Sequence, residues 1–162
     1  SHVARVEVLT RDGRFEVREP HDYAIGYRSV RRADGSAPDG IFTAAWFRFA
    51  PGDATRARAR IKELLARRIA TQPLSLPNAG SVFRNPPDDH AARLIEAAGL
   101  KGASIGGARV SELHANFIVN PGGRASAADI ESLIERVRAT VQERHGVALE
   151  AEVRVVGEAR KR

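Results

Sequence analysis

A serine hydroxyl beside a glycine is the first feature of this sequence that could do chemistry. Residues 78–86 read Asn-Ala-Gly-Ser-Val-Phe-Arg-Asn-Pro. Gly80 allows a positive φ or a close approach of the backbone to a ligand, and it leaves the hydroxyl of Ser81 without a bulky neighbour on that side. The segment has neither the Gly-x-Ser-x-Gly pattern of a nucleophile elbow nor the Gly-Lys-Ser/Thr pattern of a phosphate-binding loop. A Gly-Ser turn whose Phe83 fills the core is the alternative interpretation.

Two charged side chains could stabilise charge in a reaction. Glu152 lies in residues 149–156, where polar and apolar residues alternate. This alternation predicts a strand that puts Glu152 and its two neighbouring valines on opposite faces. The carboxyl group would then point into a cleft or lie on a solvated strand face. Arg28 lies in the polar stretch 19–40, for which we expect an irregular loop. Because the chain is rich in arginine, one loop arginine is not by itself evidence of a functional role.

A glycine-rich stretch and a histidine give weaker signals. Four glycines could hold a phosphate through backbone N–H groups, but their spacing fits no dinucleotide-binding pattern, and ordinary turns also explain them. They are Gly99, Gly102, Gly106 and Gly107. His114 precedes a predicted strand at 115–120, and it has no second histidine or carboxylate at a spacing typical of metal ligands. The sequence contains no cysteine, which excludes disulfides, thiolate metal sites and a cysteine nucleophile.

The elements that would position these residues form no regular alternation of strand and helix. Periodicity and turn residues predict strands at 3–9, 14–17, 41–49, 115–120 and 149–156, and helices at 54–69, 89–98 and from about 127 to 145. Asp53 is suited to cap the first helix, Ser126 and Asp129 resemble a capping box for the third, and Gly146 would end it. This mixture predicts the α+β fold class.

The length of 162 residues suits one domain, or one domain with part of another. Pro51-Gly52 is the expected boundary, with a strand-rich segment at 1–50 that is too short for its own core and a compact α+β domain at 51–162. No Met stands at position 1, so we expect a part of a longer protein. No stretch reads as a membrane span or a leader, and the expected location is the cytoplasm.

The formal net charge of +6 favours anionic partners, such as nucleic acids, phosphorylated metabolites or an anionic surface. One alternative function is therefore a small basic module that binds RNA or another polyanion. It rests on the Arg-rich segment 56–68 and the basic tail 160–162. Acidic residues interspersed on the predicted helices, and the lack of an RNA-recognition motif, count against it.

Taken together, several short motifs resemble one family in their order and spacing. They are Gly26-Tyr27-Arg28-Ser29, Gln72-Pro73-Leu74, Asn78 to Pro86, Leu94 to Gly102, Ile105 to Ala108, His114 to Asn120 and Glu152-Val153-Arg154. The chain resembles the UDP-N-acetylenolpyruvoylglucosamine reductases over nearly its whole length. Each motif is weak alone, and the ordered set is specific.

The resemblance implies an FAD enzyme of peptidoglycan precursor synthesis. In that family NADPH reduces the flavin, which then passes a hydride to C3 of UDP-N-acetylglucosamine enolpyruvate. Carried over by position, Ser81 matches the donor of the proton to C2, Arg28 the arginine near the substrate carboxylate, and Glu152 its acidic partner. Tyr27, Asn85 and His114 match positions close to the substrate. We expect no nucleic-acid partner, no metal and no membrane insertion.

One part of the family pattern is missing from the sequence. The family binds FAD mainly through an upstream segment with Gly-rich loops, and nothing here matches that segment. The resemblance therefore implies that residues 1–50 are the trailing strands of the FAD-binding domain and residues 51–162 the substrate-binding domain. Because one helix separates residue 49 from the motif at 72, the chain resembles the shorter branch, which lacks an inserted tyrosine-bearing loop. We expect the isolated chain to be inactive.

Overall fold

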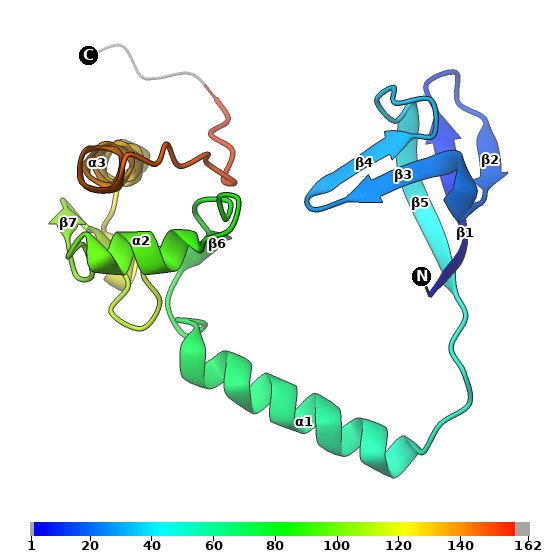
Figure 1. Cartoon of the computed structure of the whole chain (residues 1–162), viewed down its shortest axis with the longest axis horizontal. Coiled ribbons are helices and arrows are strands. Elements are labelled where there is room, and N and C mark those ends of the chain that lie inside the picture. Colours follow the sequence, from blue (N-terminus) through cyan, green and yellow to red (C-terminus); the bar gives the residue numbers. More distant parts are fainter. Residues whose placement is uncertain (1, 158–162) are drawn as a thin grey trace. The chain divides into compact units, whose positions relative to one another are not determined.

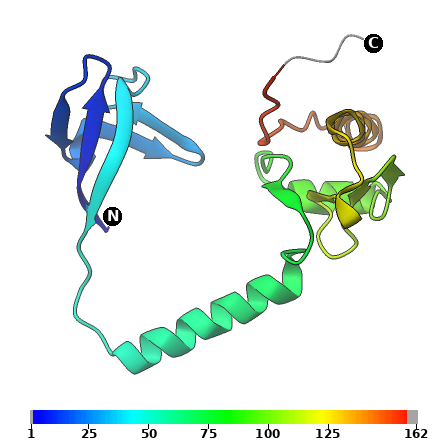
Figure 2. The ribbon, with the colours of Figure 1, turned by 180° about the vertical axis from the view of Figure 1, so that it is seen from behind.

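The computed structural model describes residues 2–157 and contains both helices and strands, as the predicted α+β class requires (Figures 1 and 2). The chain divides into two compact units, residues 1–57 and 58–162. Among the described residues, no helix combines the length and apolar character needed to cross a bilayer. The basic tail 160–162 lies outside the described residues.

The first unit is built on a three-stranded antiparallel sheet with the order β2-β1-β5. Its strands are β1 (Val3–Thr10), β2 (Phe15–Arg18) and β5 (Gly40–Phe47). The turn between β1 and β2 contains Gly13 at a φ of +84°, and the backbone N–H of Gly13 donates to the carbonyl of Thr10 at 3.0 Å. The Asp-Gly pair thus forms a turn at the point where glycine tolerates left-handed backbone.

The polar stretch at 19–40 is not an irregular loop, as we expected, because it contains a β-hairpin. Its strands are β3 (Tyr23–Gly26) and β4 (Ser29–Arg32), preceded by the 3-10 turn η1 (Pro20–Asp22). Ile25 pairs with Val30, and both are exposed. The hairpin extends away from the sheet (Figure 1). Strands that face solvent on both sides need few apolar residues. The sequence of this hairpin therefore shows no hydrophobic pattern from which its strands could be predicted.

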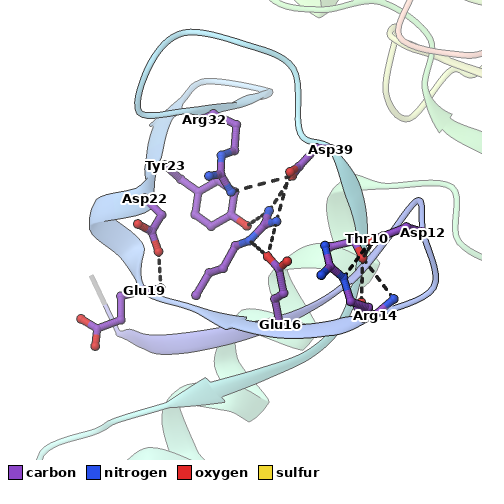
Figure 3. A network of polar contacts seen from close by, with 10 residues as sticks. Thr10, Asp12, Arg14, Glu16, Glu19, Asp22, Tyr23, Arg32 and Asp39 are labelled. Atoms are coloured by element: carbon purple, nitrogen blue, oxygen red, sulfur yellow. Dashed lines mark hydrogen bonds and ion pairs between the residues drawn. The ribbon is translucent and has the colours of Figure 1, made fainter.

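A buried arginine joins the hairpin to the sheet (Figure 3). Arg18 is 8% exposed and donates to the carboxylates of Glu16 and Asp39, at 2.6 and 2.5 Å, with the Tyr23 hydroxyl 3.5 Å away. Its guanidinium holds the pKa of the Asp39 carboxyl below its usual value. Val8 is the only buried hydrophobic residue that the structure describes in this unit. Ion pairs and backbone hydrogen bonds therefore tie the unit together in place of a large core.

Helix α1 (Ala54–Thr71) crosses the division between the units. Its first turn is capped as expected, because the Asp53 carboxylate accepts from the backbone N–H of Thr55 at 2.7 Å and of Arg56 at 3.1 Å. The apolar side chains of the helix are between 47% and 66% exposed. They are Ile61, Leu64, Leu65 and Ile69. The amphipathic pattern correctly predicted the helix, but no element within residues 2–157 buries the apolar face.

The second unit contains the hydrophobic core. Its antiparallel sheet has the order β6-β9-β8-β7, and α3 packs against β7, β8 and α2. The strands are β6 (Asn78–Ser81), β7 (Ser104–Ile105), β8 (Ala108–Val110) and β9 (Phe117–Val119), and the helices are α2 (Ala91–Ala97), α3 (Ala127–His145) and the 3-10 turn η2 (Pro121–Gly123). Every residue of β9 is buried, which explains its continuous apolar sequence.

The prediction of a strand at 149–156 is wrong. The segment forms a single bridge, between Ala151 and Phe83, and the structure assigns no strand there. Continuing the antiparallel pairing would bring residues 153–155 opposite 79–81. There Gly80 has a φ of +81°, which interrupts the extended backbone that a ladder needs. An alternating sequence is therefore not sufficient for a strand when its partner bends.

Local signals at both ends of α3 are confirmed. The Ser126 side chain accepts from the backbone N–H of Asp129, and the Asp129 carboxylate accepts from that of Ser126, which completes the capping box. These hydrogen bonds hold the pKa of Asp129 below its usual value. Gly146 ends the helix in the left-handed conformation, with a φ of +69°.

Replacing Ser126 with Ala should lower the free energy of unfolding by about 1 kcal/mol, because the first turn of α3 loses an acceptor for a backbone N–H. Urea denaturation followed by circular dichroism measures this loss. Ser132→Ala, at an exposed position inside the same helix, is the matched control and should change stability by less than about 0.5 kcal/mol. Equal effects of the two substitutions would contradict the capping role.

Candidate active site

Ser81 is the last residue of β6 and is half-buried. The preceding residues are fixed by Asn78, whose Oδ1 accepts from the Gly80 N–H at 2.9 Å and whose Nδ2 donates to the carbonyl of Leu76 at 2.8 Å. The positive φ at Gly80 confirms the expected need for glycine. A Cβ at this position would meet nothing within 4 Å, so the space on that side of Gly80 is open.

The residues that follow Ser81 are held by Asn116. The carbonyl of Asn116 accepts from the Val82 N–H at 2.9 Å. Its side chain accepts from the Phe83 N–H at 2.9 Å and donates to the Phe83 carbonyl at 2.8 Å. Phe83 is 1% exposed, so it fills the core as the alternative interpretation of this segment expected. Sequence reasoning gave Asn116 no role, although an asparagine among the apolar residues 115–119 was an available signal.

The C-terminal segment brings Glu152 to the same stretch of chain. The backbone N–H of Glu152 donates to the Val82 carbonyl at 2.8 Å, and the N–H of Arg84 donates to the Glu150 carbonyl at 2.9 Å. The Arg84 and Glu150 side chains also form an ion pair, at 2.9 Å. Glu152 is half-buried. Two of the three expected catalytic residues, Ser81 and Glu152, therefore lie on neighbouring hydrogen-bonded segments.

Asn85 and His114 support the site from two loops of the same unit. The Asn85 Oδ1 accepts from the N–H of Ala91, the first residue of α2, at 3.1 Å. This leaves its amide nitrogen as the group that could donate to a ligand. The Nδ1 of His114 accepts from the Asn116 N–H at 3.3 Å, and the ring packs edge-on against Phe117 with centroids 4.8 Å apart.

Tyr27 and Arg28 belong to the first unit and form the turn between β3 and β4. Arg28 has a φ of +54°, and its guanidinium lies 5.8 Å from the centre of the Tyr27 ring. A non-glycine residue in the left-handed region costs roughly 1 kcal/mol, and such strain is common at functional positions. Tyr27 and Arg28 therefore lie together in the first unit, and the other four expected site residues belong to the second unit.

The glycine-rich stretch does not fit a phosphate. A Cβ on Gly102 would collide with the carboxylate of Glu112, and one on Gly106 with that of Asp129. The absence of a side chain at these glycines therefore admits acidic groups, which repel an anion. A groove of about 410 Å³ beside β6 is lined mainly by apolar side chains, including Ile130, and is equally unsuited to a diphosphate. Neither the glycine-rich stretch nor this groove therefore fits the diphosphate of FAD.

Burial lowers the pKa of the His114 imidazole below its ordinary value of 6.5, and the nearby Lys101 acts in the same direction. The unfolded chain therefore binds this proton more readily than the folded one. The stability that depends on neutral His114 should be complete above about pH 6.5 and be lost as the pH falls through the lower pKa of the folded state.

His114→Gln should flatten the dependence of stability on pH below 6.5, because glutamine stays neutral and can still accept from the Asn116 N–H. Urea unfolding at pH 7, 6 and 5 measures the free energy of unfolding of both proteins. His90→Gln, at an exposed histidine, serves as the control and should keep the slope of the parent chain. Parallel curves for the parent and His114→Gln would show that the imidazole is not linked to folding.

Comparison with known proteins adds a family to this geometry. Residues 72–156 match the family described as UDP-N-acetylenolpyruvoylglucosamine reductase, C-terminal domain. The chain is 57% identical over 160 residues to the UDP-N-acetylenolpyruvoylglucosamine reductase of Alkalilimnicola ehrlichii, covering 98% of this chain and 52% of the relative. It is also 57% identical over 159 residues to the reductase of Methylococcus capsulatus, covering 98% of this chain and 51% of the relative.

A solved structure agrees with these matches. The crystal structure of the reductase from Thermus caldophilus is similar with a TM-score of 0.75 and 36% sequence identity, over 93% of this chain and 52% of that one. The chain therefore spans about half the length of the relatives that it matches. None of these matches supports the alternative of a basic RNA-binding module.

Proposed function

Because the chain belongs to the UDP-N-acetylenolpyruvoylglucosamine reductase family, we propose that it supplies the substrate-binding and proton-donating part of such an enzyme. The reaction would reduce UDP-N-acetylglucosamine enolpyruvate to UDP-N-acetylmuramate, in the cytoplasm, as a step of peptidoglycan precursor synthesis. The observation that carries this proposal is the pairing of the Ser81 and Glu152 segments beside the open space at Gly80.

FAD and NADPH are the cofactors that this family implies, and bound flavin would supply the hydride for C3 of the enolpyruvyl group. The glycine-rich stretch does not fit the FAD diphosphate, since carboxylates lie beside Gly102 and Gly106. The part corresponding to the half of each relative that the match leaves uncovered would hold the flavin. Residues 1–50 would then complete the FAD-binding domain, residues 51–162 would form the substrate-binding domain, and the chain alone would be inactive.

Ser81 would protonate C2 of the substrate. Addition of hydride to C3 leaves negative charge on C2 and on the adjacent carboxylate, which makes C2 strongly basic. A serine hydroxyl is a weak acid, but it can donate to such a carbon when it is held within hydrogen-bond distance. The open space at Gly80 would admit the enolpyruvyl group.

The charged and polar residues would bind and stabilise the substrate. The guanidinium of Arg28 would face the carboxylate and stabilise its growing charge, with Glu152 as the acidic partner beside the same group. Tyr27 and Asn85 would contact the substrate close to these residues, with the amide nitrogen of Asn85 as a donor. His114 would lie near the nucleotide part of the substrate.

The test uses residues 1–162 joined to the part of the Methylococcus capsulatus reductase that the match leaves uncovered, called the joined enzyme below. Ser81→Ala should leave reduction of the flavin by NADPH within about twofold of the parent. It should slow reoxidation of the flavin by the enolpyruvyl substrate by about 10² or more, because the proton donor is lost. Stopped-flow absorbance separates the two half-reactions.

Ser132→Ala is the matched control for this test, because its exposed hydroxyl lies on α3 and has no role in the proposed reaction. Both half-reactions of this variant should match the parent. Unchanged rates for both half-reactions of Ser81→Ala would exclude the serine as proton donor. Failure of the parent joined enzyme to reduce the substrate would contradict the proposed function itself.

A further inference from the structure

Asn116 has all its polar groups engaged, and most of them hold the chain just after Ser81. It is 4% exposed. Its side chain binds both the N–H and the carbonyl of Phe83, at 2.9 and 2.8 Å, and its carbonyl binds the Val82 N–H at 2.9 Å. Its own N–H donates to His114 Nδ1 at 3.3 Å. Because a buried amide is costly unless it is fully hydrogen-bonded, this set of contacts fixes the side chain in one orientation.

The contacts of Asn116 complete a support that begins before the serine. On the N-terminal side, the Asn78 side chain holds the Gly80 N–H at 2.9 Å. On the C-terminal side, Asn116 holds the two residues that follow Ser81. The backbone carrying the serine is therefore tied at both ends, although Gly80 is free to adopt many conformations. The second of these contacts comes from Asn116, which directly precedes β9 and lies 33 residues after Phe83 in the sequence.

We propose that Asn116 is a positioning residue for the Ser81 hydroxyl, which it holds at the distance and direction needed to protonate the substrate. This inference rests on the proposed function, since it assigns Asn116 a part in the same proton transfer. A hydroxyl is a poor acid, so its rate of donation depends strongly on geometry, and a displacement of about 1 Å can slow a reaction by about 10². Asn116 touches no reacting atom and acts through Val82 and Phe83.

The first test is a double-mutant cycle in the joined enzyme. Asn116→Ala should slow reoxidation of the flavin by the enolpyruvyl substrate by about 10-fold to 10², while reduction by NADPH stays within about twofold. The same substitution placed on Ser81→Ala should slow reoxidation by less than about a further twofold, because the group that it positions is already absent. A residue with a merely structural role would slow the two backgrounds equally.

Asn120→Ala is the matched control. Its side chain also accepts a backbone N–H, that of Ala125 at 2.8 Å, but it holds the entry to α3 and not the serine segment. Both half-reactions of this variant should stay within about twofold of the parent, even where its stability falls. A slowing of reoxidation in Asn120→Ala as large as that in Asn116→Ala would mean that any loosening of the unit has this effect, and would overturn the proposal.

A second readout needs neither cofactor nor activity. In the 162-residue chain, Asn116→Ala should raise amide hydrogen exchange at Val82 and Phe83, with exchange at the buried α3 residue Leu133 unchanged. Asn116→Gln keeps both the acceptor and the donor and displaces them by one methylene group, so it should give intermediate exchange and intermediate reoxidation. This variant carries the test if Asn116→Ala does not fold.

The positioning role of Asn116 and the proton-donor role of Ser81 would fail with different results. Equal slowing by Asn116→Ala with and without the serine hydroxyl would overturn the positioning role and leave Ser81 as the proton donor. Unchanged exchange at Val82 and Phe83 would have the same consequence. A Ser81→Ala enzyme with normal reoxidation would instead remove the proton donor itself, and the role of Asn116 with it.

Discussion

The hydrogen bonds between the Asn116 side chain and the Phe83 backbone are the interaction on which the site depends. They connect Asn116, the residue directly before the fully buried strand β9, to the segment that follows Gly80, whose φ is positive. On its other side that segment is paired with residues 150–152. Ser81 and Glu152 lie together because both flank one short stretch, 82–84, that is hydrogen-bonded from two directions.

The glycine-rich stretch of the second unit is poorly suited to hold a dinucleotide. The glycines at 102 and 106 make room for the carboxylates of Glu112 and Asp129, so the stretch packs against acidic groups in place of a phosphate. The division agrees with a chain that covers about half of each relative. Hydride chemistry and proton delivery would then be supplied by different halves of the enzyme.

The first unit has little hydrophobic core, so other interactions must stabilise it. Arg18 binds Glu16 and Asp39 where the sheet meets the hairpin, and Asp39 also lies 3.8 Å from Arg32. Only Arg18 of this cluster is buried, and removing its carboxylate partners would leave a buried charge without compensation, so the network can hold the hairpin in one register. The turn of this hairpin carries Arg28 in the left-handed region. The proposed carboxylate-binding role of Arg28 would require such an anchored hairpin beneath a strained residue.

The sequence alone determined the features that depend on neighbouring residues: the caps at Asp53, Ser126 and Gly146, the positive φ at Gly80, and the ordered motifs that identify the family. Tertiary structure decided what depends on distant partners. The segment after Glu152 is no strand because Gly80 bends its partner, the hairpin at 23–32 forms although its strands are exposed, and Asn116 acquires its role from Phe83, 33 residues earlier. Caps and turns are closed by hydrogen bonds within a few residues, whereas strand pairing and side-chain support require contacts that local sequence cannot specify.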